Sequence, residues 1–575
     1  MKNVKNLFGM AVMATALVGC SSNDNLNPNA NDNAGKAGEA YASFKINLPT
    51  VSGTRADDDP KPGTPDLVHG DPAEYEVKNG TILIFDANTD KFVESAELGT
   101  MNPWTAEKDP NGVTTAAAVT VKLSKVALDG HYKALVLLNN NSGTTPKVKL
   151  PTSTTTTIDT YTSWSAKAGN VTPAEYLKTD GIFMANAPKY EKATEDPTTL
   201  VDIHLYASRE QAQANSATVV YVERGLAKVT MENFNSSGYT IAAGNTYAGD
   251  KVEIKTWQLD VTNKTTFPIH QANLKSGWSD IWNTPRFYDT KATSAFKRVY
   301  WGTDPNYSGT DNQTLAECKN AFNMIGNGDV KGLPGTPQYC LENTFDLDNM
   351  MQGQTTRVVF KAVYTPKTFT TGETFYKVAN NTAVWKGDAL AQQILTLAIK
   401  AMKITDPVEQ AMYSVDLSKG SNISGVAGQH LIAADNIIFD PGSSTKTSKV
   451  DPNVVNEVNA KLGLSEADPT KHKEKVGIST YLNGEAYYIA RIKHFNELTP
   501  WTAGTAYNGD NNAFLGRYGV LRNNWYSLSV HGISNLGYPE VPEVKPTTPD
   551  DENDQYINVE VKILDWAKRS QSIDL

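Results

Sequence analysis

Two residues near the N-terminus could undergo covalent processing. Cys20 ends the stretch Leu17-Val18-Gly19-Cys20, and its thiol can carry a lipid. Arg55 lies in Thr54-Arg55-Ala56-Asp57 and is the only arginine before Arg209, so a protease that cuts only after arginine has one cutting site in this part of the chain. An acidic stretch flanked by glycine and proline is accessible to such enzymes. Both features indicate maturation of the chain itself, with a cut between Arg55 and Ala56.

The residues before Cys20 read as a targeting segment. Lys2 and Lys5 are followed by an apolar run over 7–18, which is too short to cross a bilayer as a helix. The run ends in a motif that resembles the lipobox of bacterial lipoproteins, in which the cysteine becomes the lipidated first residue and carries the two or more acyl chains that stable anchoring needs. An ordinary secretory signal with a chance cysteine is the alternative.

Two alternating segments lie at opposite ends of the chain and predict half-buried strands. Near the start, Phe44, Ile46 and Leu48 alternate with polar residues, and a cut after Arg55 would remove this strand. Near the end, a similar strand is predicted whose apolar residues could fill the same kind of groove. They are Ile557, Val559, Val561 and Ile563, with Trp566 as a plug beyond them. A chain that can lose one strand and carries a spare one is suited to polymerisation.

Composition limits the classes of partner. The formal net charge of −10 and the pI near 5.4 argue against nucleic acid, and membrane contact is expected only through the lipid of the precursor. The length of 575 residues predicts more than one domain. Cys318 and Cys340 could form a disulfide in an oxidising compartment, while two free buried thiols are the other reading.

Short strands separated by turn residues dominate the chain and predict an all-β fold. We expect two antiparallel β-sandwich domains, a few short helices near 388–402 and 453–462, and an extended C-terminal strand. A Pro- and Asp-rich stretch before this strand is expected to be extended and solvated. The predicted segments are a lipoprotein signal peptide at 1–20, a tether with the removable first strand at 21–55, an N-terminal sandwich at 56–265, a C-terminal sandwich at 266–537, and a linker with the last strand at 538–575.

Motifs for catalysis, cofactors or structural metals are not evident in the sequence. The segment 86–90 with Glu97 partly matches a calcium loop, but its sixth position is Lys91 where such loops need glycine, and a hairpin turn explains the same residues. An aromatic cluster could stack on sugars, although aromatic residues of β domains more often fill cores. The cluster comprises Trp278, Trp282, Phe287, Tyr288, Phe296, Tyr300 and Trp301.

These features together resemble the Bacteroidales fimbrillins, the subunits of type V pili, and more narrowly the major subunit of the short fimbrium. The resemblance covers nearly the whole chain. It rests on the lipobox, on Thr54-Arg55-Ala56, on 223–229 (Glu-Arg-Gly-Leu-Ala-Lys-Val), on 520–530 with its Arg-Asn-Asn-Trp-Tyr core, and on the terminal strand with Trp566.

The resemblance implies a non-enzymatic structural subunit without cofactors that supports adhesion. The lipidated precursor would reach the outer membrane, an arginine-specific protease would cut after Arg55, and the C-terminal strand of a neighbouring copy would enter the vacated groove of a cell-surface fimbrium. Accessory anchor and tip subunits and host or bacterial surface ligands are further implied partners. A monomeric outer-membrane lipoprotein that binds glycans is the alternative function, and a surface hydrolase is a third reading for which no residues can be named.

Overall fold

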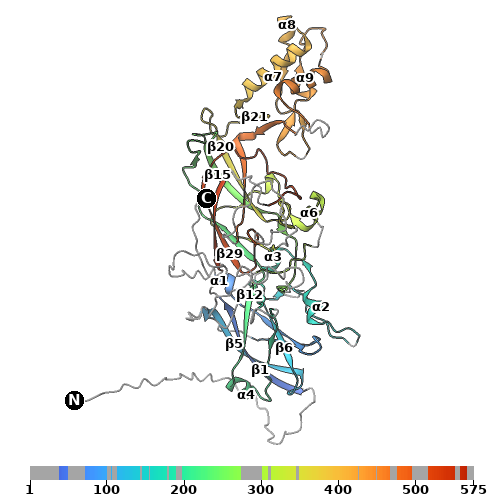
Figure 1. Cartoon of the computed structure of the whole chain (residues 1–575), viewed down its shortest axis with the longest axis vertical. Helices are drawn as coiled ribbons and strands as arrows, with labels where there is room; N and C mark the ends of the chain where they lie inside the picture. Colours follow the sequence, from blue (N-terminus) through green and yellow to red (C-terminus); the bar gives the residue numbers. More distant parts are fainter. Residues whose placement is uncertain are drawn as a thin grey trace, which may run out of the picture.

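The computed structural model is an elongated, strand-rich molecule in which three parts follow one another (Figure 1). The N-terminal sheet lies at one end, a β-sandwich lies in the middle, and a mixed helix and strand unit lies at the other end. The structure describes residues 38–49, 72–99, 105–106, 113–142, 145–154, 156–177, 180–189, 197–272, 299, 301–307, 312–344, 349–424, 426–448, 450–466, 475–494, 516–550 and 557–565. Over these ranges the expected all-β character is confirmed. None of the helices in them has the length and apolar character needed to cross a membrane.

The N-terminal sheet has the order β3-β2-β6-β10-β12-β1-β5-β4, with β11 on an edge of β6. All its pairings are antiparallel except β1 with β12. Four short helices flank it, at Pro72–Tyr75 (α1), Tyr161–Ser165 (α2), Pro173–Tyr176 (α3) and Arg209–Ala214 (α4). The strands are β1 Gly38–Pro49, β2 Gly80–Asp86, β3 Phe92–Glu97, β4 Thr105–Ala106, β5 Val113–Val126, β6 Tyr132–Leu138, β10 Met184–Asn186, β11 Val201–Asp202 and β12 Thr218–Arg224.

Burial along these strands follows their sequence patterns. The near-continuous apolar run of β6 contributes to cores on both faces of the sheet, with Val136 in one cluster and Leu137 in the other, as expected for a strand covered on both sides. In β1, Phe44 and Ile46 are fully buried while Lys45 between them is exposed. The alternating strand predicted at this position is therefore present.

Two four-stranded sheets form the middle sandwich around one core. Their orders are β19-β13-β29-β30 and β14-β15-β20-β28, and large buried rings such as Trp257, Phe360 and Tyr526 pack between them. Aromatic residues suit this position because each buries a large apolar area in one layer. The strands are β13 Ala227–Met231, β14 Tyr239–Thr240, β15 Lys251–Asp260, β19 Gln338–Cys340, β20 Arg357–Thr365, β28 Glu485–Arg491, β29 Asn524–Ile533 and β30 Ile557–Asp565.

The boundary between the N-terminal sheet and the middle sandwich does not lie where the predicted division between 56–265 and 266–537 placed it. The chain leaves the N-terminal sheet at the end of β12 and enters the middle sandwich at once with β13. The turn between them contains Gly225, where an added Cβ would lie 3.0 Å from the ring of Tyr176. Strands β13 and β15 thus pair with strands from the C-terminal half, which the sequence pattern of alternation does not reveal.

The unit at the far end is inserted between β20 and β28. Its two main helices, α7 (Gly387–Met402) and α9 (Pro452–Leu462), confirm the two helices expected in this part of the chain. Asp451 caps α9 by accepting hydrogen bonds from the backbone N–H groups of Asn453 and Val454. A core of its own, with Leu390, Ile394 and Val458 fully buried, makes this insert a third unit that was not predicted.

The possible disulfide between Cys318 and Cys340 is not present. Both thiols are free and buried, and they belong to different cores. Cys318 lies in helix α6 (Leu315–Ala321), where its thiol donates to the backbone oxygen of Asn312 at 3.2 Å. Cys340 ends β19 in the sandwich core, and burial raises its pKa to about 12. Of the two readings of the sequence, two separate buried thiols is the one that the structure supports.

Candidate polymerisation interface

Strand β1 occupies a slot in the middle of the N-terminal sheet. It pairs antiparallel with β5 from Gly38 to Pro49 and parallel with β12 from Phe44 to Asn47. Both of its edges are therefore hydrogen bonded along the segment 44–47. A strand in this position could not leave without exposing two strand edges and the core beneath.

The slot is apolar on one side and partly polar on the other. The side chains of the predicted removable strand, Phe44, Ile46 and Leu48, are at most 1% exposed and pack into the core of the N-terminal sheet. On the other face, the hydroxyl groups of Ser43 and Thr120 are 2.8 Å apart. This alternation fixes the register, because a shift by one residue would place every apolar side chain on the polar face.

Strand β1 is an imperfect occupant of the slot. Its first half offers only the small side chains of Ala40 and Ala42 to the core, opposite Leu123 and Val121 of β5. On the polar face, the side-chain oxygen of Asn47 is buried without a hydrogen-bond partner. An unsatisfied buried acceptor costs roughly 1–3 kcal/mol.

A cationic side chain lies on the polar face of the slot near its centre. Arg209 at the start of α4 lies 5.8 Å from the ring centroid of Tyr41 and donates to the backbone oxygen of Thr120 at 3.3 Å. Thr120 is directly opposite Ser43 of β1. An occupant residue at position 43 therefore lies beside the guanidinium group.

The predicted spare strand forms β30 and pairs with β29 of its own chain. It lies at an end of its sheet, so in the described part of the molecule only one of its edges is paired. The positions of Val559, Val561 and Ile563 are directly opposite Val530, Leu528 and Tyr526. Leu528 and Tyr526 are fully buried in the sandwich core. The backbone register therefore places Val561 and Ile563 of β30 directly opposite core residues of β29.

The connection from β29 to β30 is much longer than pairing requires. Residues Ile533 and Ile557 are directly opposite each other, and adjacent antiparallel strands are usually joined by 2–5 residues. Here 23 residues, 534–556, lie between the two strands, by subtraction of 533 from 556. We refer to residues 538–550 of this connection as the strap.

The strap is packed against the body of the protein, so the prediction that this stretch is solvated was wrong for the described residues. Its backbone at Tyr538 exchanges two hydrogen bonds of 2.8 Å with Tyr487 of β28. Val541 is 8% and Val544 is 5% exposed, and each lies in an apolar cluster with residues of the body. Prolines and acids in the sequence suggested a free linker, but the two valines between them provide buried anchors.

Polar groups hold the strap at defined points. Arg357 donates to the backbone oxygen of Pro542 at 2.6 Å and forms a buried ion pair with Asp260, with Nε 2.8 Å from Oδ2. Further along, the carboxylate of Asp550 accepts a hydrogen bond from the hydroxyl of Thr355 at 2.9 Å and is 1% exposed. Specific polar partners on the body therefore hold the strap at Pro542 and Asp550.

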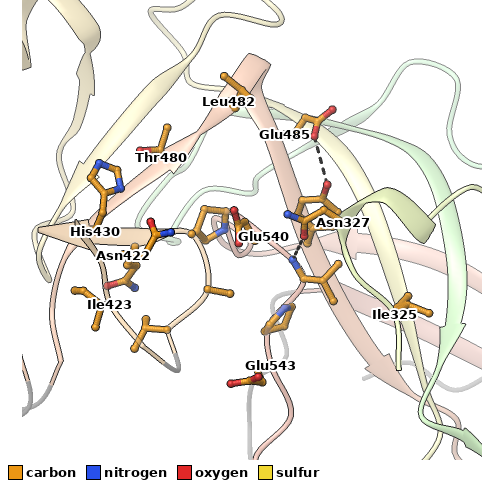
Figure 2. A pocket seen from close by; sticks show the side chains of 18 of the residues that line it. Ile325, Asn327, Asn422, Ile423, His430, Thr480, Leu482, Glu485, Glu540 and Glu543 are labelled. Atoms are coloured by element: carbon orange, nitrogen blue, oxygen red, sulfur yellow. Dashed lines mark hydrogen bonds between the residues drawn. The ribbon is translucent and has the colours of Figure 1, made fainter. Parts of the chain in front are cut away.

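A cleft of about 670 Å³ lies between the strap and the insert. Figure 2 shows Glu540 and Glu543 of the strap across from Asn422 and His430 of the insert. On the same side as the strap, Asn327 accepts a hydrogen bond from the backbone N–H of Val541 at 2.7 Å. The strap thus forms one wall of the cleft.

Buried charges join the N-terminal sheet to the sandwich. Arg224 at the end of β12 donates to the backbone oxygen of Glu74 at 2.8 Å and to the side-chain oxygen of Asn523 at 3.1 Å. Burial lowers the pKa of Arg224 to about 9. Arg522, next to Asn523, pairs with Glu342 through Nε at 3.2 Å from Oε1. Asn523 has φ 58°, in the left-handed region that asparagine tolerates better than most residues.

Several residues singled out in the sequence lie outside the described ranges, namely Cys20, Arg55, Ala56 and Trp566, as do all members of the aromatic cluster except Trp301. Trp301 is fully buried, in keeping with a core role. Asp86 accepts hydrogen bonds from the backbone and hydroxyl of Thr89, each at 2.8 Å, which lowers its pKa and explains the residue by turn chemistry. Within the described ranges, no group of three or more His, Cys, Asp or Glu side chains is arranged to bind a metal ion.

Comparison with known proteins found several similar solved structures and one matching family model. Three solved structures are similar at low identity: a protein assigned to cell adhesion from Parabacteroides distasonis (12% identity, 92% of this chain and 99% of that chain, TM-score 0.36), a fimbrial assembly protein from the same species (12%, 60% and 93%, TM-score 0.27), and a C-terminally truncated tip fimbrial protein from Porphyromonas gingivalis (10%, 92% and 100%, TM-score 0.28). No curated protein matches the sequence.

The family assignment rests on the sequence of the C-terminal region, because none of these TM-scores reaches 0.5. Residues 479–572 match the family model described as "Major fimbrial subunit protein type IV, Fimbrillin, C-terminal". The matched region contains β28, β29, the strap and β30, which are the elements that carry the predicted spare strand. The C-terminal region of the chain therefore matches the fimbrillin family.

Proposed function

We propose that this chain is the structural subunit of a surface fimbria that is exported as a lipoprotein, cut between Arg55 and Ala56, and polymerised by strand exchange. In this proposal β1 leaves with the lipidated N-terminal piece, and β30 of a second copy fills the slot. The observation that carries the proposal is the contrast between the two strands. The slot pairs its occupant on both edges, whereas β30 on its own sheet is an edge strand.

The free-energy balance favours transfer of β30 into an empty slot. The pairs that β30 loses at β29 are replaced by pairs with β5. The net gain is the second edge, where β1 forms four residue pairs with β12. At about 0.5–1.5 kcal/mol for each hydrogen bond, four pairs contribute roughly 2–6 kcal/mol. Each closed slot also removes two open strand edges.

The long connection supports the same proposal because it gives β30 reach. If the strap leaves its docking site, 23 residues can extend to roughly 80 Å at about 3.3–3.6 Å per residue. A two-residue turn would pair β29 with β30 equally well but would tie the strand to its own sheet. Insertion of one copy into the next is a head-to-tail contact that does not close on itself, and such contacts produce filaments.

The proposal includes the place of assembly and the partners. The precursor would be anchored in the outer membrane through Cys20, an arginine-specific protease would release it, and copies of the chain would form the fimbrial shaft at the cell surface. The shaft would support adhesion to host or bacterial surfaces and would join accessory anchor and tip subunits. Within the family, the resemblance to the major subunit of the short fimbrium favours this shaft role.

The test compares three soluble chains by size-exclusion chromatography and negative-stain microscopy. One begins at Ser21, the second begins at Ala56, and the third begins at Ser21 and carries Arg55→Ala. Filaments are expected from the second chain, and from the first only after limited cleavage at arginine. The third chain should remain monomeric under the same protease. Filaments from the uncut Arg55→Ala chain, or monomers from the chain that begins at Ala56, would contradict the proposed mechanism.

A further inference from the structure

We infer that β30 of a second copy enters the slot in the direction of β1, antiparallel to β5, with Asn558 opposite Thr120. In this register Ile557, Val559, Val561 and Ile563 take the positions of Ala42, Phe44, Ile46 and Leu48. The inference rests on the proposed function, because it specifies how the exchanged strand lies in that slot. Three independent features of the slot support this direction over its reverse.

The first feature is the length of the two ladders. Strand β1 forms eleven residue pairs with β5, all antiparallel, and four with β12, all parallel. Antiparallel pairing is slightly more stable per residue than parallel pairing. A strand that keeps the direction of β1 has antiparallel geometry along the longer ladder, over eight of the nine residues of β30. The reverse direction would make the longer ladder parallel.

The second feature is the cationic group on the polar face. Position 43 of the slot lies opposite Thr120, whose backbone oxygen accepts a hydrogen bond from Arg209. In the direction of β1, the neutral Asn558 takes position 43. If the strand is reversed while its apolar residues stay on the apolar face, Lys562 takes position 43. Its ammonium group then lies beside the guanidinium group of Arg209. Because two like charges repel each other at this distance, the direction of β1 is favoured over its reverse.

The third feature is the acidic residue at the end of β30. In the inferred direction, Asp565 falls at position 50, beyond Pro49 and outside the paired part of the slot. In the reverse direction it falls at the position of Ala40, which is fully buried and directly opposite Leu123. An unpaired carboxylate in an apolar core is strongly unfavourable. The direction of β1 is the one that leaves this charge in water.

The two directions predict different cross-links between copies. Chains that begin at Ala56 are prepared with Thr120→Cys, with Asn558→Cys or with Lys562→Cys, and are mixed in pairs during assembly under mild oxidation. Non-reducing gels should show intermolecular cross-links for 120 with 558 and at least tenfold fewer for 120 with 562. Thr120→Ser is the matched control, and it also accounts for any reaction of the buried thiols of Cys318 and Cys340.

The cross-links test the direction and the register of the inserted strand separately. A dominant cross-link between 120 and 562 would overturn the direction, and filaments without either cross-link would overturn the register. Absence of filaments from the unsubstituted chain would instead count against the proposed function. A test without cysteines uses charge: Asn558→Lys should slow assembly several-fold because it adds a cation beside Arg209, whereas Lys562→Asn should not. The opposite order of these two rates would also overturn the direction.

Discussion

Glu74 and Lys228 form a buried ion pair, with Oε1 2.7 Å from Nζ, that joins α1 of the N-terminal part to β13 of the sandwich. Both side chains are less than 5% exposed. The hydroxyl of Tyr339 donates to the same carboxylate at 2.5 Å, and the ammonium group lies 3.9 Å from the ring centroid of Trp525. This cluster links the N-terminal part of the molecule to the sandwich.

Removal of one partner of this pair should be costly. Lys228→Met leaves the carboxylate of Glu74 buried without its counter-charge, and such changes typically cost about 3–5 kcal/mol. Chemical denaturation should show this loss in the free energy of unfolding, and Lys228→Met with Glu74→Leu should recover most of it. The exposed pair of Lys122 with Glu39 provides the control, since Lys122→Met should change stability by less than about 1 kcal/mol. Equal effects at the two lysines would contradict the argument.

Weakening β1 should destabilise the precursor. Phe44→Ala removes a fully buried ring from the slot, for which a loss of about 3–5 kcal/mol in the free energy of unfolding is expected. Lys45→Ala on the exposed face of the same strand should change it by no more than about 0.5 kcal/mol. Denaturation of the chain that begins at Ser21 measures both variants. A small effect of Phe44→Ala would mean that the slot collapses readily when it is empty.

Locking β30 to its own sheet should prevent assembly. Ser527 and Lys562 are directly opposite in the pairing of β29 with β30, so cysteines at these two positions can form a disulfide within one chain. The oxidised Ser527→Cys, Lys562→Cys chain that begins at Ala56 should remain monomeric, and reduction should restore filament formation. Each single variant controls for the substitution itself. Normal filaments from the oxidised chain would show that β30 is not the exchanged strand.

Loosening the strap should accelerate assembly. Val541→Ala with Val544→Ala removes methyl groups from two buried sites, at about 0.8 kcal/mol for each group, without altering the core of the sandwich. The lag before filaments appear should shorten, and limited proteolysis should cut the strap sooner. Glu543→Ala with Lys545→Ala, both exposed, is the matched control. An unchanged lag together with faster proteolysis would mean that strap release does not limit the rate.

Stability should depend on pH through Asp304. Burial raises the pKa of this carboxyl group to about 7, above its ordinary value of 3.8, although Asn306 and Thr344 donate hydrogen bonds to it. The folded state then binds a proton more tightly than the unfolded state, so this contribution is full below about pH 4 and is lost as the pH rises through 7. Denaturation curves between pH 5 and 8 should show a decline that Asp304→Asn removes. An identical decline in that variant would assign the effect to other groups.

The sequence predicted the strands whose side chains alternate and the helices with clear caps. Strand β1 and helix α9 could be predicted from local patterns. Alternation of apolar and polar residues indicates a strand with one buried face, and an Asp-Pro pair indicates the start of a helix. Pairing partners could not be predicted this way. The position of β1 between β5 and β12 depends on residues 64–174 positions away along the chain. Alternation indicates which face of a strand is buried, but not which strand lies beside it.

The docking of the strap could not be predicted from its composition. Its composition resembles that of a solvated linker, and only the spacing of Val541 and Val544 between prolines marked possible anchors. Whether such anchors are used depends on the body surface that Arg357 and Asn327 present to them. The free state of Cys318 and Cys340 likewise follows from the separate cores that contain them, which no spacing along the chain could indicate.

The pairing of the slot on both edges has a mechanical consequence. A strand at the edge of a sheet can be peeled away, one hydrogen bond after another, by a small force applied at its end. A strand between two neighbours that is pulled along its own axis must break many bonds at once. If the strap transmits the load of a fibre to the inserted β30 at Ile557, shear flow over the cell would pull on each junction in this stronger geometry. In the proposed exchange, the site of β30 at the edge of its own sheet and the slot of the next copy, paired on both edges, would therefore differ in rupture force as well as in equilibrium stability.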